Sequence, residues 1–126
     1  MGAWAEYNPN PKGKRTGDCT ARAICKATGQ DWDSVYCAVC AVGFSEKEFP
    51  STDSIWGAYL RSLGFRRRII PDTCPDCYTV RDFTLEHPAG TYILGTGHHA
   101  VCVKGGRYWD AWDSGDEIPV YYWEKV

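Results

Sequence analysis

The hydrophobic pattern of the chain changes near Gly64, and this change limits the fold more than any other feature. Before Gly64, apolar residues recur at helical spacing, whereas after it short apolar runs are separated by glycine and proline. Helices followed by strands predict an α+β fold, in which N-terminal helices pack on a C-terminal antiparallel sheet. The length of 126 residues fits one domain spanning 1–126.

Start and stop residues predict three helices in the first part of the chain. Asp18 is suited to be an N-cap, and Gly29 is suited to end the helix that follows. Residues 1–17 contain two Asn-Pro pairs and are expected to form an extended arm. The helices are expected from about Asp18 to Thr28, after Asp31 as far as Gly43, and from Thr52 or Asp53 to Gly64.

The second part of the chain is expected to form strands around a glycine turn. Gly105-Gly106 is a strong signal for a two-residue hairpin. A short helix capped by Thr79 and closed by Pro88 should interrupt the strands. The strands are expected at Phe65 to Ile70, Thr91 to Leu94, His99 to Val103, Arg107 to Trp112 and Pro119 to Trp123.

Cys19 is the residue most suited to chemistry, because it opens the first predicted helix. A thiol attacks well only as its thiolate, and a helix N-terminus and a nearby imidazolium both lower a cysteine pKa. The backbone N–H of Cys19, at the same helix start, is suited to stabilise an oxyanion. Asp18 beside the thiol would oppose thiolate formation unless it caps the helix or pairs with Arg15 or Arg22.

His99 and Asp110 follow Cys19 far downstream, on two strands of the predicted hairpin. If Lys104 pairs with Arg107, Asp110 shares the face of His99, whereas a one-residue change in the loop would favour Asp113. We therefore expect Asp110 to orient the histidine and keep Asp113 in reserve. The competing histidine, His98, should point away from His99, because side chains alternate along a strand. These groups predict acyl transfer through a Cys-His-Asp triad and a thioester acyl-enzyme.

Two stretches resemble the papain-like cysteine peptidases, and most closely the compact papain-fold proteins of bacteria and their phages. Residues 10–23 read N-P-K-G-K-R-T-G-D-C-T-A-R-A, and residues 99–113 read H-A-V-C-V-K-G-G-R-Y-W-D-A-W-D. The sequence Asp18-Cys19-Thr20 is also similar to the bacterial cell-wall amidase and endopeptidase group of that superfamily. The resemblance implies a papain-like fold and a thiol protease with Cys19, His99 and Asp110 in the catalytic roles.

Other residues are assigned to the oxyanion and the substrate. Asn10 is the first choice for a second oxyanion donor and Thr16 the alternative, although Asn10 before Pro11 is also a typical turn residue. Trp112, opposite His99, is expected beside the substrate, whereas the other C-terminal aromatic residues belong mostly to the sheet core. The chain holds no glutamine shortly before Cys19, where papain-like enzymes usually have one.

The sequence has seven cysteines, and two C-x-x-C pairs raise the alternative of a structural zinc site. The pairs are Cys37 with Cys40 and Cys74 with Cys77, and the gap between them is longer than in zinc ribbons. Plain structural thiols are the preferred interpretation, and no cofactor is expected. A papain-fold binding module without turnover, or a zinc-stabilised interaction domain, is the alternative to an enzyme. Cys25 and Cys102 are expected in the core.

Charge and hydropathy limit the classes of partner that the sequence supports. The formal net charge of −2 gives no argument for a nucleic-acid or membrane partner. We expect a peptide or protein substrate, and the sequence leaves the oligomeric state open. No apolar N-terminal stretch resembles a signal peptide, so a cytoplasmic protein with reduced thiols is expected.

Overall fold

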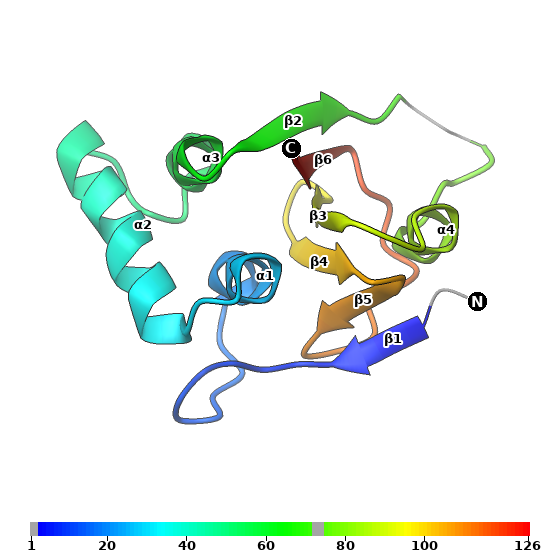
Figure 1. The fold of residues 1–126 in the computed structure, drawn as a ribbon, viewed down its shortest axis with the longest axis horizontal. Helices are drawn as coiled ribbons and strands as arrows, with labels where there is room; N and C mark the ends of the chain where they lie inside the picture. The colour runs from blue at the N-terminus through cyan, green and yellow to red at the C-terminus, as the bar shows by residue number, and fades with distance from the viewer. Residues whose placement is uncertain (1–2, 72–74) are drawn as a thin grey trace.

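The computed structural model describes residues 3–71 and 75–126. Within these ranges the chain is α+β, with four helices and six strands (Figure 1). The helices are α1 (Cys19–Thr28), α2 (Trp32–Glu46), α3 (Asp53–Ser62) and α4 (Val80–Glu86). The strands are β1 (Ala3–Glu6), β2 (Phe65–Ile69), β3 (Thr91–Gly95), β4 (Ala100–Lys104), β5 (Arg107–Asp110) and β6 (Tyr121–Lys125). Among the helices described, none is long and apolar enough to cross a bilayer.

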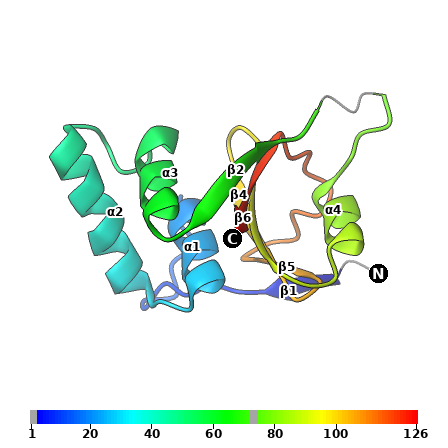
Figure 2. The ribbon, with the colours of Figure 1, turned by 45° about the horizontal axis from the view of Figure 1, so that its top comes forward.

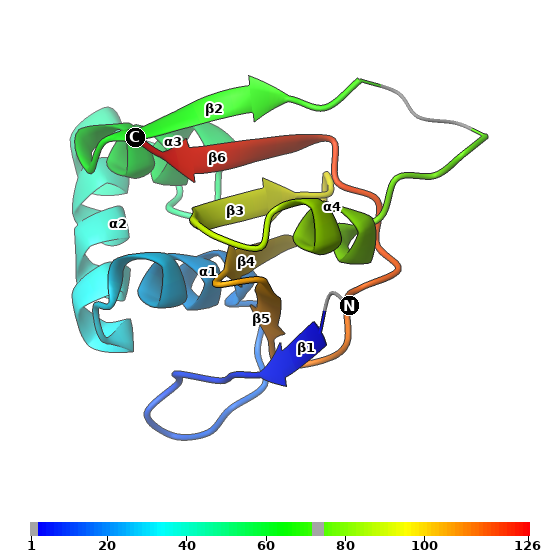
Figure 3. The same cartoon turned by 45° about the vertical axis from the view of Figure 1, so that its right-hand side comes forward.

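The six strands form one mixed sheet in the order β1-β5-β4-β3-β6-β2. The pairing of β1 with β5 is parallel, and the other pairings are antiparallel. The expectation of a purely antiparallel sheet is therefore wrong at one edge, where β1 from the N-terminal arm pairs in parallel with β5. Figures 2 and 3 show α1, α2 and α3 on one side of the sheet and α4 on the other.

Strand alternation divides the core between the two faces of the sheet. Ile93 and Cys102 pack with the first three helices, whereas their neighbours Leu94, Val101 and Val103 pack with α4. Each central strand is therefore apolar on both faces, as expected for a sheet covered on both sides. Cys102 is fully buried in this core. The first of the two clusters also holds Cys25, so both cysteines lie in the core as predicted.

The predicted extended arm contains a strand that the sequence pattern does not reveal. Ala3–Glu6 pairs with Arg107–Asp110, about a hundred positions further along the chain. A four-residue strand with one buried side chain, Ala5, carries little periodicity. Its partner also lies too far away to be inferred from local signals.

Helix α2 continues three residues beyond the predicted stop at Gly43. The loop that follows turns back onto this glycine, and Glu48 N–H donates to the Gly43 carbonyl at 2.9 Å. A Cβ at Gly43 would lie 2.6 Å from the Glu48 carbonyl oxygen. Gly43 therefore permits a close backbone approach rather than ending the helix. Lys47, with φ of 59°, adopts the left-handed conformation that ends it.

The Gly105-Gly106 hairpin has the predicted register. Lys104 pairs with Arg107, and Cys102 pairs with Trp109. Both glycines have positive φ, 61° and 75°, as a type I′ turn requires. The strand after the turn stops at Asp110, two residues before the predicted end, because the backbone then turns away toward Ser114.

Candidate active site

Three elements bring Cys19, His99 and Asp110 together. Cys19 is the first residue of α1, His99 directly precedes β4, and Asp110 is the last residue of β5. His99 Nε2 lies 2.6 Å from Asp110 Oδ2. Cys19 and His99 line the same cavity, and the interaction with Cys19 contributes to the raised pKa of His99. Since Nε2 faces Asp110, the ring nitrogen left for the thiol is Nδ1. The imidazole therefore lies between the sulfur and the carboxylate.

The surroundings of Cys19 favour its thiolate. Burial by itself would raise the pKa of the thiol. Hydrogen bonds to His99, to the backbone N–H of Ala100 and to the Thr20 hydroxyl act in the opposite direction, as does the charge on His99, and they bring the pKa below its ordinary value. As the first residue of α1, Cys19 has a backbone N–H with no acceptor inside the helix. That N–H remains suited to an oxyanion.

The surroundings of His99 favour its imidazolium form. Burial would lower its pKa, but the hydrogen bonds and charges of Asp110 and Cys19 raise that pKa to about 9. The lowered pKa of Cys19 and the raised pKa of His99 both favour the thiolate–imidazolium pair. This is the protonation state that nucleophilic attack by sulfur requires.

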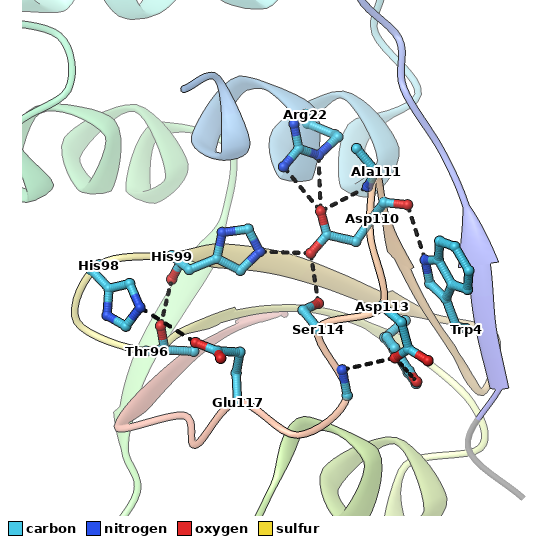
Figure 4. A network of polar contacts seen from close by, with 12 residues as sticks. Trp4, Arg22, Thr96, His98, His99, Asp110, Ala111, Asp113, Ser114 and Glu117 are labelled. Atoms are coloured by element: carbon cyan, nitrogen blue, oxygen red, sulfur yellow. Dashed lines mark hydrogen bonds and ion pairs between the residues drawn. The ribbon is translucent and has the colours of Figure 1, made fainter. Parts of the chain in front are cut away.

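Asp110 is fully buried, and each of its carboxylate oxygens has two partners (Figure 4). Oδ2 accepts from His99 and from Ser114 Oγ, at 2.6 Å each. Oδ1 accepts from the Ala111 backbone N–H at 2.8 Å and from the Arg22 guanidinium, with Nη2 at 2.9 Å. Burial would raise the pKa of Asp110, yet the bonds from His99 and Ser114 and the charges of His99 and Arg22 lower it.

Arg22 and Ser114 are site residues that sequence reasoning missed. Arg22 was considered only as a partner of Asp18, although a charged residue beside Ala23 and Ile24 in an apolar stretch is a signal in itself. Its side chain is almost fully buried and bonds both carboxylates, with Nη1 2.8 Å from Asp18 Oδ1. Nothing in the sequence distinguishes Ser114 from a loop serine.

Asp18 occupies the N-cap position of α1 but does not cap it, which corrects the predicted role. Its carboxylate makes no hydrogen bond to the helix start. Oδ1 instead pairs with Arg22, and Oδ2 accepts from the Trp32 indole N–H at 2.9 Å. The buried guanidinium of Arg22 therefore offsets the negative charge next to the thiol. Pairing of Asp18 with Arg22 is one of the alternatives that the sequence left open.

The arm fixes the backbone of Asp110 from the other side. The Asp110 carbonyl accepts from the Trp4 indole N–H at 3.1 Å and from the Tyr7 backbone N–H at 2.9 Å. Strand β1, which supplies Trp4, therefore positions the carboxylate as well as extending the sheet (Figure 4).

The two alternative residues make other contacts, although His98 lines the cavity at Cys19. The His98 side chain is 80% exposed and its Nε2 faces Glu117 at 3.4 Å. Asp113 accepts from the Tyr108 hydroxyl at 2.6 Å and lies 3.6 Å from Arg81. Neither side chain is bonded to His99 in Figure 4, so the structure selects the pair His99 and Asp110.

The residues predicted to contact the oxyanion or the substrate lie in different places relative to Cys19 and His99. Trp112 contacts the His99 ring, with centroids 4.9 Å apart, but it is not among the residues that line the cavity at Cys19, so its contact with substrate stays a prediction. Asn10 does not line the cavity at Cys19, and its Oδ1 accepts from Lys12 N–H at 2.9 Å. Asn10 is thus a turn residue, which is the alternative to an oxyanion donor that the sequence left open. Thr16 lines a neighbouring cavity rather than the one that contains Cys19.

A cavity of about 260 Å³ opens in front of Cys19 and His99. Its walls come from the start of α1, from the beginning of α3 and from β6. Sequence reasoning did not single out Ser51, Asp53 or Trp56, which line it together with Tyr121. A substrate carbonyl placed in this cavity would lie beside the sulfur and close to the N-terminus of α1.

The four cysteines considered for a zinc site do not form a cluster among the residues that the structure describes. Cys74 lies outside the described residues. Cys37 and Cys40 are on α2, where Cys37 is exposed rather than packed in the core as expected for a buried helix face. Cys77 is exposed and lies in the segment that precedes α4. Among residues 3–71 and 75–126, no group of three or more metal-binding side chains comes together.

Comparisons with known proteins found no matching family model, no matching curated protein and no matching solved structure. Conclusions about function therefore depend on the geometry of the site and on the residues that form it.

Proposed function

We propose that the protein is a cysteine peptidase or a related amide hydrolase that acts through Cys19, His99 and Asp110. The observation that carries the proposal is the position of His99, which lines one cavity together with Cys19 and whose Nε2 lies 2.6 Å from the buried carboxylate of Asp110. This arrangement activates a sulfur nucleophile and holds a proton ready for the leaving group.

The reaction would begin with attack of the Cys19 thiolate on the substrate carbonyl carbon. The electrons of the C=O bond move to oxygen, and the Cys19 backbone N–H at the start of α1 stabilises the oxyanion. When the intermediate collapses, the C–N bond breaks and His99 Nδ1–H gives its proton to the leaving amine. The acyl group then remains on sulfur as a thioester.

Hydrolysis of the thioester would use the same groups in reverse. His99, now neutral, accepts a proton from water as the water oxygen attacks the thioester carbonyl. The C–S bond breaks, and the carboxylic acid leaves a thiolate beside an imidazolium. Asp110 stays ionised throughout and stabilises the charge on His99, because Arg22, Ser114 and Ala111 N–H hold its carboxylate.

We place the protein with the papain-like superfamily, in its compact bacterial or phage type, on the basis of the two motif stretches. The chain order supports this, since the nucleophile opens a helix and the histidine and carboxylate follow on a hairpin. We further propose a cytoplasmic location, because the thiolate of Cys19 and the exposed thiols of Cys37 and Cys77 need a reducing compartment to persist.

A peptide-library cleavage screen tests this function, with cleaved bonds identified by mass spectrometry. Wild-type protein should cut peptides, and Cys19→Ser should not. Asp110→Asn should reduce kcat/KM by about a hundredfold or more, because the imidazolium loses its counter-charge. Asp113→Asn is the matched control and should stay within a few-fold of wild type, since Asp113 bonds Tyr108 and not His99. Cleavage by Cys19→Ser at the wild-type rate would contradict the proposal, and so would a wild-type protein that cuts no peptide.

A further inference from the structure

Helix α2 lies at the outer edge of the molecule, with α1 and α3 on its inner side (Figures 1 and 2). Its buried residues are Val35, Val39 and Gly43, so one side of the helix packs against the rest of the chain. The outward side is also largely apolar, since only Asp33 and Glu46 carry a charge among the 15 residues of α2. A helix that is apolar all round is normally covered on all sides, so the outward side of α2 is where a partner is expected.

Two phenylalanines at the end of α2 and just beyond it are exposed to solvent. Phe44 is 77% exposed and Phe49 is 78% exposed, more than any other large apolar side chain that the structure describes. Both line a surface cavity of about 270 Å³. Burial of these rings against a partner would be favourable, because each leaves a large apolar area in water.

Five residues form an outward stripe along α2, which we call the α2 stripe. Asp33, Tyr36, Cys40, Phe44 and Lys47 are separated by three, four, four and three positions, which is the same spacing read from either end. At 3.6 residues per turn, this spacing keeps them within an arc of about 80°. Lys47 ends the helix, and its Nζ lies 4.1 Å from the centroid of the Phe44 ring, so the ammonium group stays beside the stripe.

The α2 stripe is complementary to a second copy of itself that runs in the opposite direction. With Cys40 on a two-fold axis, Tyr36 meets Phe44 of the second copy, and Asp33 meets Lys47 of the second copy. A parallel arrangement would place Asp33 against Asp33 and Lys47 against Lys47, which like charges oppose. Within the described ranges, neither Asp33 nor Lys47 has an ion-pair partner in its own chain. Both charges are therefore available to a second copy.

We propose that the protein forms a two-fold symmetric homodimer in which the α2 helices of two copies pack antiparallel around Cys40. A second copy fits this surface better than an unrelated apolar partner, because the acidic and basic ends of the α2 stripe match each other. The small side chain of Cys40 at the crossing point also lets the two helix axes approach closely. The inference does not depend on the proposed hydrolase function.

Exchange of the two charges tests the antiparallel arrangement. Gel filtration with light scattering, in reducing buffer and up to about 1 mM protein, measures the dimer dissociation constant. Asp33→Lys and Lys47→Asp should each raise it by about tenfold or more, because each change places like charges against each other. The double variant Asp33→Lys/Lys47→Asp should return to within a few-fold of wild type. A helix that is merely destabilised would give the opposite result, since the double variant opposes the helix dipole at both ends.

A matched pair of apolar positions and a cross-link complete the test. Phe44→Asp should abolish the dimer over the same concentrations, whereas Leu85→Asp should leave the dissociation constant within a few-fold of wild type. Leu85 is an exposed residue of α4, on the other side of the sheet, and circular dichroism checks that each variant is folded. A short bis-maleimide should join two wild-type copies through Cys40, as identified by mass spectrometry of the linked peptides.

Several results would overturn the inference. Wild type with a monomer mass at every concentration is one, and a dimer that Phe44→Asp leaves unchanged is another. A dimer that the charge exchange does not restore, or whose copies are never linked through Cys40, would contradict the antiparallel register. Binding of monomeric wild type to phospholipid vesicles, lost in Phe44→Asp, would assign the outward side of α2 to a membrane surface instead of a second copy.

Discussion

Arg22 connects the nucleophile helix to the carboxylate of the candidate triad. It lies three residues after Cys19, on the same side of α1, and its guanidinium reaches both Asp18 and Asp110. A guanidinium suits this place better than an ammonium would, because its several N–H groups can bond two carboxylates at once. The position of Cys19 relative to Asp110 therefore depends on one buried side chain.

Removing the charge of Arg22 should destabilise the protein strongly. Arg22→Met leaves two carboxylates without their shared cation, one of them fully buried, and should lower the free energy of unfolding by about 3–5 kcal/mol. The control is Arg15→Met, which breaks an exposed pair with Glu6 and should cost about 1 kcal/mol or less. Urea denaturation measures both. Equal losses in the two variants would show that the buried network does not stabilise the fold.

Among the elements, the Thr79 cap and the hairpin could be predicted from the sequence, whereas the site network could not. Thr79 caps α4 as predicted, in a capping box with Asp82, and Gly105-Gly106 sets the register that brings Asp110 to His99. Local signals suffice there because the interacting residues lie a few positions apart. Strand β1 and the bonds of Arg22 to Asp110 join residues about ninety to a hundred positions apart, and no local pattern encodes them.

The two threonine N-caps differ in a way that stability measurements can detect. Thr79 accepts a hydrogen bond from Asp82 N–H at 3.1 Å, whereas Thr52, at the same position before α3, makes no side-chain cap bond. Thr79→Ala should therefore lower the free energy of unfolding by about 1 kcal/mol, and Thr52→Ala by only a few tenths. Thr79→Ala should leave peptide cleavage unchanged, since α4 packs on the sheet face away from α1 (Figure 2). A larger loss in Thr52→Ala, measured by urea denaturation, would contradict the role of the cap.

At the scale of the whole molecule, the two faces of the sheet differ in what they carry. The face covered by α1, α2 and α3 carries the two adjoining cavities, and the face covered by α4 carries a second apolar core. The candidate site lies at one end of the sheet, where α1 begins, β4 begins and β5 ends (Figure 3). The three residues therefore meet where α1 packs against β4 and β5.

The pH dependence of stability should reveal the raised pKa of His99. A group whose pKa is higher in the folded state than in the unfolded chain stabilises the fold at low pH, and that contribution is lost as the pH rises through the folded value, here about 9. In a Cys19→Ser background, the thiol neither titrates nor raises the pKa of His99, but Asp110 still raises it. The free energy of unfolding should therefore fall by on the order of 1 kcal/mol as the pH rises above about 6.5. Adding His99→Gln should remove this decrease. The same slope with and without His99 would show that the Asp110 pair does not hold the proton.

The central claim is that His99 turns the Cys19 thiol into a thiolate, and the rate of alkylation of Cys19 measures this most directly. Iodoacetamide labelling at about pH 6, followed by mass spectrometry of the cysteine peptides, compares Cys19 with the exposed Cys37 in the same molecule. Wild type should label Cys19 at least tenfold faster than Cys37. His99→Ala should abolish that difference, because burial then raises the pKa of the thiol unopposed by the imidazole. Fast labelling of Cys19 that persists in His99→Ala, or equal labelling of the two cysteines in wild type, would contradict the account.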